Sequence, residues 1–407
     1  MNRSGFGSPR IFIARAFART LTGDRRRDLV RLAGTLRRKI TGATATVHYF
    51  HDPQDPYSQL AATQLGALAR RYHIVIRCHA VPPPRAAAAP APAALLDWSQ
   101  RDARCFARHF GLPPPANEPV DGLDDLSDAA LLRGENLRHR LGHYLGATFF
   151  FEGEWYSGLD RLHYLESRLQ QAGLARSTAP KADSALFAPP SLQWRRVTPE
   201  ASARPPTLHF FCSLRSPYTY LAIDRVRRLA RHYGATLRLD YVLPMVMRGL
   251  PVPWSKRRYI LLDAKREATR LGLPFGDVVD PVGLPTERGL AVLQRAIDTG
   301  RGEEFLESFL RGVFAEGIDA GSMGGLEHLA TRAGLTRGDV TSALADSRWR
   351  THAEENRAAL LAAGLWGVPS FKVDGFPAVW GQDRLWCVEQ DLLTALAGEA
   401  RPAGDVP

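Results

Sequence analysis

The sequence predicts a mixed α/β fold in which one domain is used twice. This rests on the order of the elements, an internal repeat and a linker. The order strand–helix–strand, helical insert, strand–turn–strand and closing helix fits residues 45–175 and again residues 207–398. It gives a mixed sheet with helices on both faces and helical residues inserted in the middle. Residues 176–206 are rich in Ser, Ala and Pro, as a linker is. Residues 1–44 are expected to form a basic leader helix or arm, and residues 399–407 a flexible tail.

The internal repeat is visible residue by residue. Three segments of the first half match three segments of the second half in the same order. The pairs are His48-Tyr49-Phe50 with His209-Phe210-Phe211, continuing to Asp55-Pro56-Tyr57-Ser58 with Ser216-Pro217-Tyr218-Thr219; Gly146-Ala147-Thr148 with Gly367-Val368-Pro369; and Gly158-Leu159-Asp160-Arg161-Leu162 with Gly381-Gln382-Asp383-Arg384-Leu385. Self-similarity of this kind predicts one structural unit used twice.

The elements follow from apolar runs and helical periodicity. In the first half, strands are expected at 46–50, 74–78, 147–151 and 155–156. Helices are expected after Leu60 as far as about Tyr72, at roughly 96–111 and 127–144, and from about 161 to 172. Residues 81–94 are rich in Pro and Ala and are expected to form a loop. In the second half, strands are expected at 208–211, 236–242, 370–373 and 378–380, and helices at 217–233, over much of 256–363 and at 384–397.

The net charge of +11 is concentrated at the start of the chain. Residues 1–40 hold eleven Arg and Lys against two Asp, a net +9 that leaves +2 for all the rest. A nearly neutral body disfavours general nucleic-acid binding. Residues 11–20 alternate apolar residues with Arg and make a poor secretory signal. Two interpretations of the leader stay open: a basic amphipathic helix that meets a membrane surface or a partner, and a solvated helix.

The cysteines and histidines indicate neither a disulfide framework nor a metal site. Cys78, Cys105, Cys212 and Cys387 lie far apart with no C-x-x-C pair, which suits a reducing, cytoplasmic location. Cys212 is expected to be a buried small hydrophobe. His139 and His143 are four residues apart on a predicted helix, but no third ligand is evident, so both are expected at the surface. No apolar run reaches the length of about 18 residues that a membrane-spanning helix needs.

The stretch from Phe210 to Leu221 contains the strongest candidate for a catalytic residue, Ser216. An apolar strand leads into Ser216-Pro217, and an amphipathic helix follows. Serine is a good N-cap, and proline fits the first helical position because its missing N–H would be unpaired anyway. The Ser216 hydroxyl is therefore expected at the positive end of a helix dipole, where it can hold an anion or stabilise a thiolate. The alternative is that Ser216 only caps the helix.

Three motifs of the second half occur in the order found in a known group of proteins. They are Ser216-Pro217-Tyr218-Thr219-Tyr220-Leu221, Gly367-Val368-Pro369-Ser370-Phe371 and Trp380-Gly381-Gln382-Asp383-Arg384-Leu385. With them, residues 207–397 resemble DsbA-like thioredoxin-fold proteins, and within these the 2-hydroxychromene-2-carboxylate isomerases and kappa-class glutathione transferases. Residues 46–172 resemble the same fold more weakly. The resemblance implies tandem thioredoxin-like folds, each with a helical insertion that is large in the second copy.

The resemblance also implies a glutathione site. The catalytic serine of the family, which hydrogen-bonds the glutathione sulfur, falls on Ser216. Its cis-proline falls on Pro369, which lets Val368 pair with the cysteinyl part of a peptide as an added strand does. Gln382 and Asp383 match positions that bind the γ-glutamyl end. A plain turn proline at 369 and a plain helix cap at 383 are the alternatives.

Lys256 matches a lysine of the family that contacts glutathione. Arg257 or Arg258 can take this role instead. The alternative is that the three adjacent cations only form a solvated face. Met247 stands where the family tends to have an asparagine, which puts the particular substrate in doubt. In the first copy, Asp55 replaces the serine and would oppose a thiolate. The sequence match places Thr148 at the cis-proline, so this copy is expected to be non-catalytic and to shape the cleft of its partner domain.

The expected function is that of a glutathione-dependent isomerase or transferase acting on an electrophilic, aromatic or apolar small molecule. Apolar side chains near the motifs can meet such a substrate, although core packing is their commoner fate: Met245, Met247, Trp254, Phe275 and Trp380. The alternative is a thioredoxin-fold binding module without chemistry. A disulfide oxidoreductase is disfavoured because Ser216 and Thr219 stand where both cysteines are needed. The oligomeric state stays open, since a tandem copy can replace a second subunit.

Overall fold

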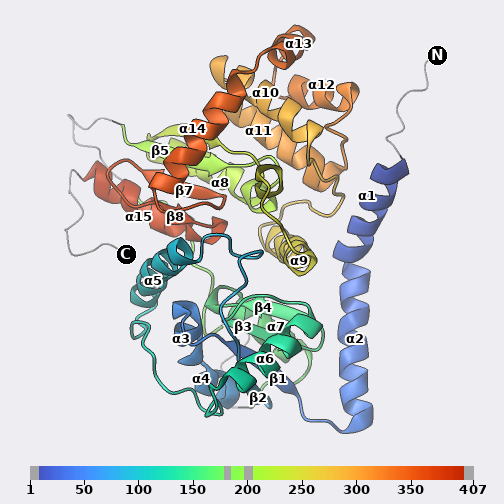
Figure 1. The fold of residues 1–407 in the computed structure, drawn as a ribbon, viewed down its shortest axis with the longest axis vertical. Helices are drawn as coiled ribbons and strands as arrows, with labels where there is room; N and C mark the ends of the chain where they lie inside the picture. Colours follow the sequence, from blue (N-terminus) through green and yellow to red (C-terminus); the bar gives the residue numbers. More distant parts are fainter. Residues whose placement is uncertain (1–8, 178–184, 197–204, 398–407) are drawn as a thin grey trace. The chain divides into compact units, whose positions relative to one another are not determined.

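The computed structural model contains two compact units, each with its own four-stranded sheet (Figure 1). It describes residues 9–177, 185–196 and 205–397, with side chains from Arg15 onwards. The N-terminal unit comprises the described residues of 24–190 together with 252–259, and the C-terminal unit those of 1–23, 191–251 and 260–406. The predicted tail at 399–407 and parts of the predicted leader and linker (1–8, 178–184 and 197–204) lie outside the described residues.

The N-terminal unit is a mixed sheet with helices of 7 to 18 residues around it. Its strands are β1 (Thr46–His51), β2 (Val75–Ala80), β3 (Thr148–Phe151) and β4 (Glu154–Ser157). Its helices are α2 (Asp24–Thr41), α3 (Pro56–Ala62), α4 (Leu65–Arg71), α5 (Pro92–His109), α6 (Asp128–Leu141) and α7 (Leu162–Gln171). The strand order is β2-β1-β3-β4, in which β1 and β2 are parallel and the other pairs antiparallel.

The C-terminal unit repeats this topology around a larger helical insert. Its strands are β5 (Thr207–Cys212), β6 (Thr236–Tyr241), β7 (Ser370–Val373) and β8 (Val379–Trp380). Its helices are α1 (Pro9–Thr22), α8 (Pro217–His232), α10 (Leu284–Asp298), α11 (Gly302–Arg311), α12 (Met323–Arg332), α13 (Arg337–Ala345), α14 (Arg348–Ala362) and α15 (Leu385–Leu396), together with residues 260–270 of α9 (Trp254–Arg270). The order β6-β5-β7-β8 again joins one parallel pair to two antiparallel pairs.

The predicted mixed α/β fold is confirmed, with helices inserted between the second and third strands of each sheet. The insert consists of α5 and α6 in the N-terminal unit and of the helices from α9 to α14 in the C-terminal unit. No helix among the described residues is both long and apolar enough to cross a membrane. That the two halves are copies of one domain stays a prediction.

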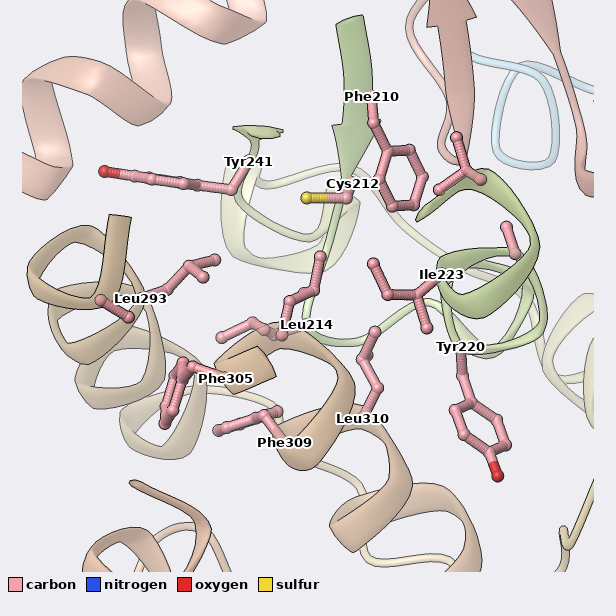
Figure 2. Packing of buried hydrophobic residues seen from close by; sticks show 14 of the residues in the cluster. Phe210, Cys212, Leu214, Tyr220, Ile223, Tyr241, Leu293, Phe305, Phe309 and Leu310 are labelled. Carbon is pink, nitrogen blue, oxygen red and sulfur yellow. The ribbon is translucent and has the colours of Figure 1, made fainter. Parts of the chain in front are cut away.

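The core of the C-terminal unit forms where β5 meets α8 and the insert. Figure 2 shows Phe210, Cys212 and Leu214 of β5 and the loop after it, pointing among side chains of α8, α10 and α11. All three are inaccessible to solvent, and Cys212 is the buried small hydrophobe that was predicted. On the same sheet α14 packs against β6, and α15 packs against β7. The strand that leads to Ser216 therefore lies between β6 and β7 and packs against α8 and the insert.

Strand pairing corrects one part of the predicted repeat. Phe50 of β1 pairs with Thr148, whereas its counterpart Phe211 of β5 pairs with Ser370. The Thr148 hydroxyl donates to the carbonyl of residue 145 at 3.2 Å, and the Ser370 hydroxyl likewise donates to that of residue 367 at 2.8 Å. Thr148 therefore matches Ser370, and Ala147 takes the place of Pro369. The sequence match aligned Gly146 with Gly367 and was therefore shifted by one residue. Backbone pairing between the strands sets the true register.

Two other local predictions are wrong. The helix expected from after Leu60 to about Tyr72 begins only at Leu65, as α4, because Thr63 caps α3 and its hydroxyl donates back to the Leu60 carbonyl at 2.7 Å. His143 was expected at the surface on a helix, but α6 ends at Leu141 before Gly142, whose φ is 92°. His143 is buried and stacks on Trp155 with ring centroids 4.6 Å apart.

The described parts of the predicted linker are held by two buried glutamates. In the N-terminal unit the backbone N–H of Leu186 donates to Glu166 at 2.7 Å. In the C-terminal unit the N–H groups of Gln193 and Trp194 each donate to Glu389 at 2.7 Å. Hydrogen bonds to a buried carboxylate are among the stronger ones, so each unit anchors its own end of this segment.

Candidate functional site

Ser216 lies at the junction of β5 and α8, as predicted. Its backbone is extended, and its Oγ accepts a hydrogen bond from the Thr219 N–H at 3.2 Å. Pro217 takes the first helical position. The side chain is partly exposed, in contrast to the buried Cys212 four residues earlier. The hydroxyl therefore sits at the positive end of a helix of 16 residues and can still meet a ligand.

The loop before β7 lies beside this hydroxyl. The Val368–Pro369 peptide bond is cis, as predicted. Ser216 Oγ donates to the Val368 carbonyl oxygen at 3.4 Å, which is long for a hydrogen bond between oxygens and therefore weak. The Val368 N–H has no backbone acceptor among the described residues. The hydroxyl proton can thus turn to a better acceptor, and Val368 keeps a backbone donor for a peptide-like ligand.

An indole ring closes the other side of this loop. A Cβ atom on Gly367 would lie 2.1 Å from Cζ2 of Trp380, so only glycine fits there. The rings of Trp366 and Trp380 meet edge to face with centroids 4.9 Å apart. The Gly381 N–H donates to the Pro369 carbonyl at 2.9 Å. These contacts hold the cis-proline loop in place and bring the segment that begins at Gly381 next to it.

Gln382 and Asp383, the predicted ligands of the γ-glutamyl end, lie in that segment. Gln382 is buried, and its amide nitrogen donates to Glu267 at 3.0 Å and to the Asp383 carboxylate. Its amide oxygen accepts from Arg225, whose pKa burial lowers to about 10. Asp383 is partly exposed. The Gln382 side chain is therefore engaged within the unit, and the glutathione contacts of both residues stay a prediction.

Arg248 is a residue that the sequence reasoning missed. It ends a short 3-10 helix, Met245–Arg248, after β6, and one terminal nitrogen donates to the Trp366 carbonyl at 3.4 Å. Its Nε is buried without a hydrogen-bond partner among the described residues, and burial lowers the pKa of the guanidinium. This cation lies beside the cis-proline loop and can donate hydrogen bonds to a carboxylate of a ligand. In the sequence, its position directly after Met247 was the one feature that could have pointed to it.

Lys256, the other predicted contact, belongs to the segment 252–259 of the N-terminal unit. Its Nζ donates to the Ala88 carbonyl at 2.6 Å and lies 6.0 Å from the centre of the Tyr144 ring. Burial lowers the pKa of this amine. Its role as a glutathione ligand stays a prediction.

The apolar residues suggested for a substrate differ in their surroundings. Phe275 is a buried core residue, and Trp254 is 60% exposed. Met245 and Met247 are partly exposed on the same short helix as Arg248. Among the suggested residues, these two thioethers therefore share a helix with the cation of the site.

In the N-terminal unit, the position that corresponds to Ser216 is Asp55, and its polar groups are engaged in local hydrogen bonds. Asp55 caps α3, and its carboxylate accepts the N–H groups of Tyr57 and Ser58 at 3.2 and 3.0 Å. It also accepts the Ser58 hydroxyl at 2.8 Å, and burial raises its pKa. The Ser58 oxygen in turn accepts the Ala147 N–H at 2.7 Å. The polar groups of this place satisfy one another. Among the residues that the structure describes, no group of three or more His, Cys, Asp or Glu is arranged to hold a metal ion.

Comparison with known proteins identifies the fold that carries Ser216. A family model described as a DSBA-like thioredoxin domain matches residues 207–393. A curated relative, the 2-hydroxychromene-2-carboxylate isomerase of Pseudomonas putida, is 25% identical over 193 residues, which are 45% of this chain and 92% of the relative.

Two solved structures are also similar to the chain. A 2-hydroxychromene-2-carboxylate isomerase is 22% identical with a TM-score of 0.40, over 47% of this chain and 98% of that one. The cytosolic disulfide reductase DsbM from Pseudomonas aeruginosa is 20% identical with a TM-score of 0.37, over 47% and 97%. DsbM was also solved with GSH.

The relatives are thus named as isomerases or disulfide oxidoreductases, and each matches less than half of this chain. The family match begins with the first residue of β5 and includes Ser216 and the cis-proline loop. The predicted family is confirmed for the second half, whereas the tandem copy stays a prediction. Residues 207–393 form a DsbA-like thioredoxin domain.

Proposed function

We propose that the DsbA-like domain binds glutathione with its sulfur at Ser216 and serves an isomerase or transferase reaction on an electrophilic small molecule. The observation that carries the proposal is the Ser216 hydroxyl itself. It stands at the N-terminus of α8 beside the cis-proline loop, where it accepts the Thr219 N–H and donates only a long hydrogen bond to the Val368 carbonyl. The curated relative of Pseudomonas putida, which is named as an isomerase, supports the reaction class.

The residues present fit this tripeptide. Glutathione carries a thiol, a peptide backbone, an ammonium group and two carboxylates. The Ser216 hydroxyl suits the sulfur, and the Val368 backbone N–H suits a peptide carbonyl. The partly exposed Arg248 guanidinium suits a carboxylate. Asp383, partly exposed in the segment beside Pro369, suits the ammonium group.

When bound, glutathione supplies a nucleophilic thiolate. Ser216 stabilises negative charge at the sulfur position in two ways. A hydrogen bond to a charged group contributes about 1.5–3 kcal/mol, and a helix N-terminus adds about 0.3–1 kcal/mol. Since one pKa unit corresponds to about 1.4 kcal/mol, these effects together lower a thiol pKa by roughly one to three units. That range brings a thiol with an ordinary pKa of about 8.5 close to neutrality.

Dithiol exchange is disfavoured by the same site. Ser216 and the buried Thr219 occupy the two positions that the cysteines of an oxidoreductase need. Cys212 is fully buried on β5, and burial raises its pKa. A neutral, inaccessible thiol is not a nucleophile. A hydroxyl that stabilises the sulfur of a bound thiol is therefore the chemistry that this site supports best.

Calorimetric titration of the full-length protein with glutathione tests the proposal. Glutathione is expected to bind and to release protons at neutral pH, because its thiol ionises on binding. S-methylglutathione, which lacks an ionisable thiol, is the matched ligand and is expected to bind without proton release. Absence of binding by glutathione would refute the proposal and would favour a binding module for other peptides.

The reaction class is tested with two substrates. 2-Hydroxychromene-2-carboxylate is expected to isomerise with glutathione left unconsumed, whereas an activated aryl chloride reports transfer through a product that carries glutathione. Ultraviolet absorbance follows the isomerisation, which leaves the mass unchanged, and mass spectrometry detects the product that carries glutathione. If wild type binds glutathione but neither substrate reacts faster than with glutathione alone, the proposed chemistry is wrong for both classes.

A further inference from the structure

Helix α2 is oriented with its charged side inwards and its apolar side outwards. Four large apolar residues of α2 are exposed: Leu29 by 65%, Leu32 by 55%, Leu36 by 48% and Ile40 by 82%. None of the residues of α2 is buried. A surface helix ordinarily places its apolar stripe against the core. The reverse orientation requires stabilising contacts on the inner side, and it leaves the apolar outer side available to a binding partner.

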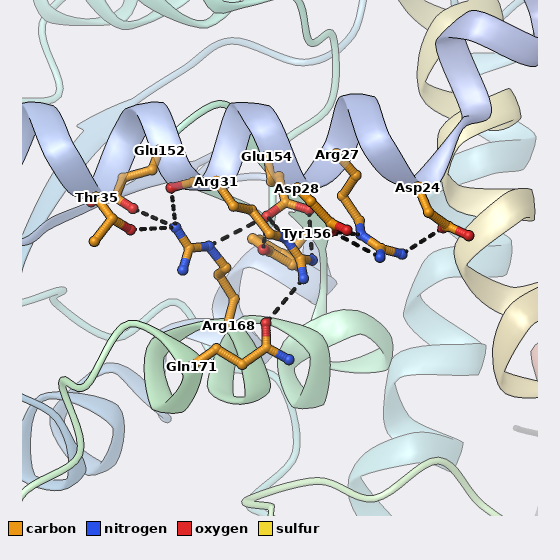
Figure 3. Close-up of polar contacts among 10 residues, drawn as sticks. All are labelled: Asp24, Arg27, Asp28, Arg31, Thr35, Glu152, Glu154, Tyr156, Arg168 and Gln171. Carbon is orange, nitrogen blue, oxygen red and sulfur yellow. Dashed lines mark hydrogen bonds and ion pairs between the residues drawn. The ribbon is translucent and has the colours of Figure 1, made fainter.

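The cause is a network of ion pairs between α2 and the β3–β4 hairpin (Figure 3). Arg31 pairs with Glu154 at 2.8 Å, and Arg38 pairs with Glu152 at 2.9 Å. Arg168 of α7 donates to Glu152 at 2.6 Å and to the backbone carbonyl of Arg31 at 3.1 Å. Arg168 is 3% exposed. Charges this well enclosed and paired hold the helix in one orientation, since turning it would leave them unpaired.

Close backbone packing supports the same orientation. A Cβ atom on Gly34 of α2 would lie 2.8 Å from Cβ of Glu152, and one on Gly153 would lie 2.9 Å from Val30 of α2. Both residues of the hairpin turn have positive φ, 44° at Glu152 and 92° at Gly153. The side of α2 that carries Val30, Gly34 and Arg38 is therefore the packed side.

The outward stripe is continuous and is flanked by cations. At about 100° per residue, Leu29, Leu32, Leu36 and Ile40 fall within an arc of roughly 80° and extend along about 16 Å of helix. Arg37 and Lys39 lie on opposite sides of this arc, and both are exposed. Neither makes an ion pair with another residue that the structure describes. The outer face thus combines apolar side chains with unpaired positive charges.

We propose that this face of α2, defined by Leu29, Leu32, Leu36 and Ile40 with Arg37 and Lys39, binds a membrane surface that contains anionic lipids. The apolar stripe enters the boundary between headgroups and acyl chains, and the two cations meet the lipid phosphates and carboxylates. In this arrangement the helix lies in the plane of the membrane.

A second copy of the chain fits this face less well. A standard protein interface needs roughly 20 to 30 residues a side, and the stripe offers four large apolar residues on one helix. Pairing two such faces would also bring the unpaired Arg37 and Lys39 of one copy close to those of the other. An anionic surface satisfies these charges instead.

Co-sedimentation of the full-length protein with vesicles tests the proposal. Wild type is expected to sediment with phosphatidylcholine vesicles that contain phosphatidylserine, and to stay in solution with phosphatidylcholine alone. The double variant Leu32→Gln/Leu36→Gln is expected to lower the partition coefficient at least about tenfold. Arg37→Gln/Lys39→Gln is expected to lower it and to flatten its dependence on salt. Both pairs are exposed, and circular dichroism checks that the variants fold.

The matched control replaces two exposed leucines elsewhere in the N-terminal unit. Leu126 is 50% exposed and Leu132 is 56% exposed. Leu126→Gln/Leu132→Gln is expected to leave vesicle binding unchanged. An equal loss in this control would overturn the proposal, and so would wild type that stays in solution with the anionic vesicles. A dimer in sedimentation velocity that Leu32→Gln/Leu36→Gln dissociates, without vesicle binding by wild type, would assign the face to a second copy instead.

Discussion

Replacing Ser216 by alanine separates its two roles, the cap of α8 and the proposed thiol donor. The substitution removes the acceptor of the Thr219 N–H, and the loss of a serine N-cap costs about 1 kcal/mol of unfolding free energy. It also removes the hydroxyl that would hydrogen-bond a bound sulfur. Since a hydrogen bond to a charged group contributes about 1.5–3 kcal/mol, the pKa of bound glutathione is expected to rise by roughly one to two units.

Two assays measure these effects on the same protein. Urea unfolding gives the free energy of unfolding, and the ultraviolet absorbance of the thiolate, followed against pH, gives the pKa of bound glutathione. Ser322→Ala is the matched control, because Ser322 caps α12 of the same unit by accepting the Gly325 N–H at 3.1 Å. The control is expected to lose a similar stability and to keep the thiol pKa. An unchanged thiol pKa in Ser216→Ala would refute the reasoning and leave Ser216 as a helix cap only.

Three further predictions concern single residues. Arg248→Gln is expected to lower glutathione affinity about tenfold in calorimetry. Its loss of stability is expected to stay below about 1 kcal/mol, because the hydrogen bond it removes, to the Trp366 carbonyl at 3.4 Å, is long; unchanged affinity would exclude Arg248 from the site. Gly367→Ala is expected to cost about 1–3 kcal/mol in urea unfolding, since its Cβ would overlap Trp380, whereas Gly324→Ala has open space in α12 and is expected to stabilise; equal effects would contradict the close packing. Burial lowers the pKa of His143 to about 3 from 6.5, so its contribution to stability is complete above pH 6.5 and is lost as the pH falls towards 3, where the unfolded chain binds a proton that the folded chain excludes. His143→Phe is expected to reduce the pH dependence of unfolding in this window by about one proton, and an unchanged slope would contradict it.

Local sequence signals were sufficient for the elements around Ser216. The apolar strand, the Ser-Pro step and the amphipathic run predicted a capped helix after β5, and the structure has that cap. The cis peptide bond before Pro369 was implied by the resemblance to the family, and the bond is cis. The helix cap depends on residues adjacent in the chain, because capping is a local property. The cis state of an X-Pro bond is not predictable from adjacent residues, since most such bonds are trans.

Features that depend on distant partners were missed or misplaced. The register between β1 and β3 placed Ala147, not Thr148, at the position of Pro369. Arg248 became part of the site through its contact with the carbonyl of Trp366, which is 118 residues away in the chain. A single sequence carries no record of which backbone groups pair across such distances.

The sequence by itself determined the mixed α/β topology, the helix cap at Ser216 and the concentration of positive charge before residue 40. It left open whether the leader is a solvated helix or a basic amphipathic one. Tertiary structure decided which side of α2 faces outwards, because Glu152 and Glu154 pair with Arg38 and Arg31 on the inner side. Amphipathic periodicity defines the two faces of a helix, but the charges of the surrounding fold determine which of them remains in contact with the solvent.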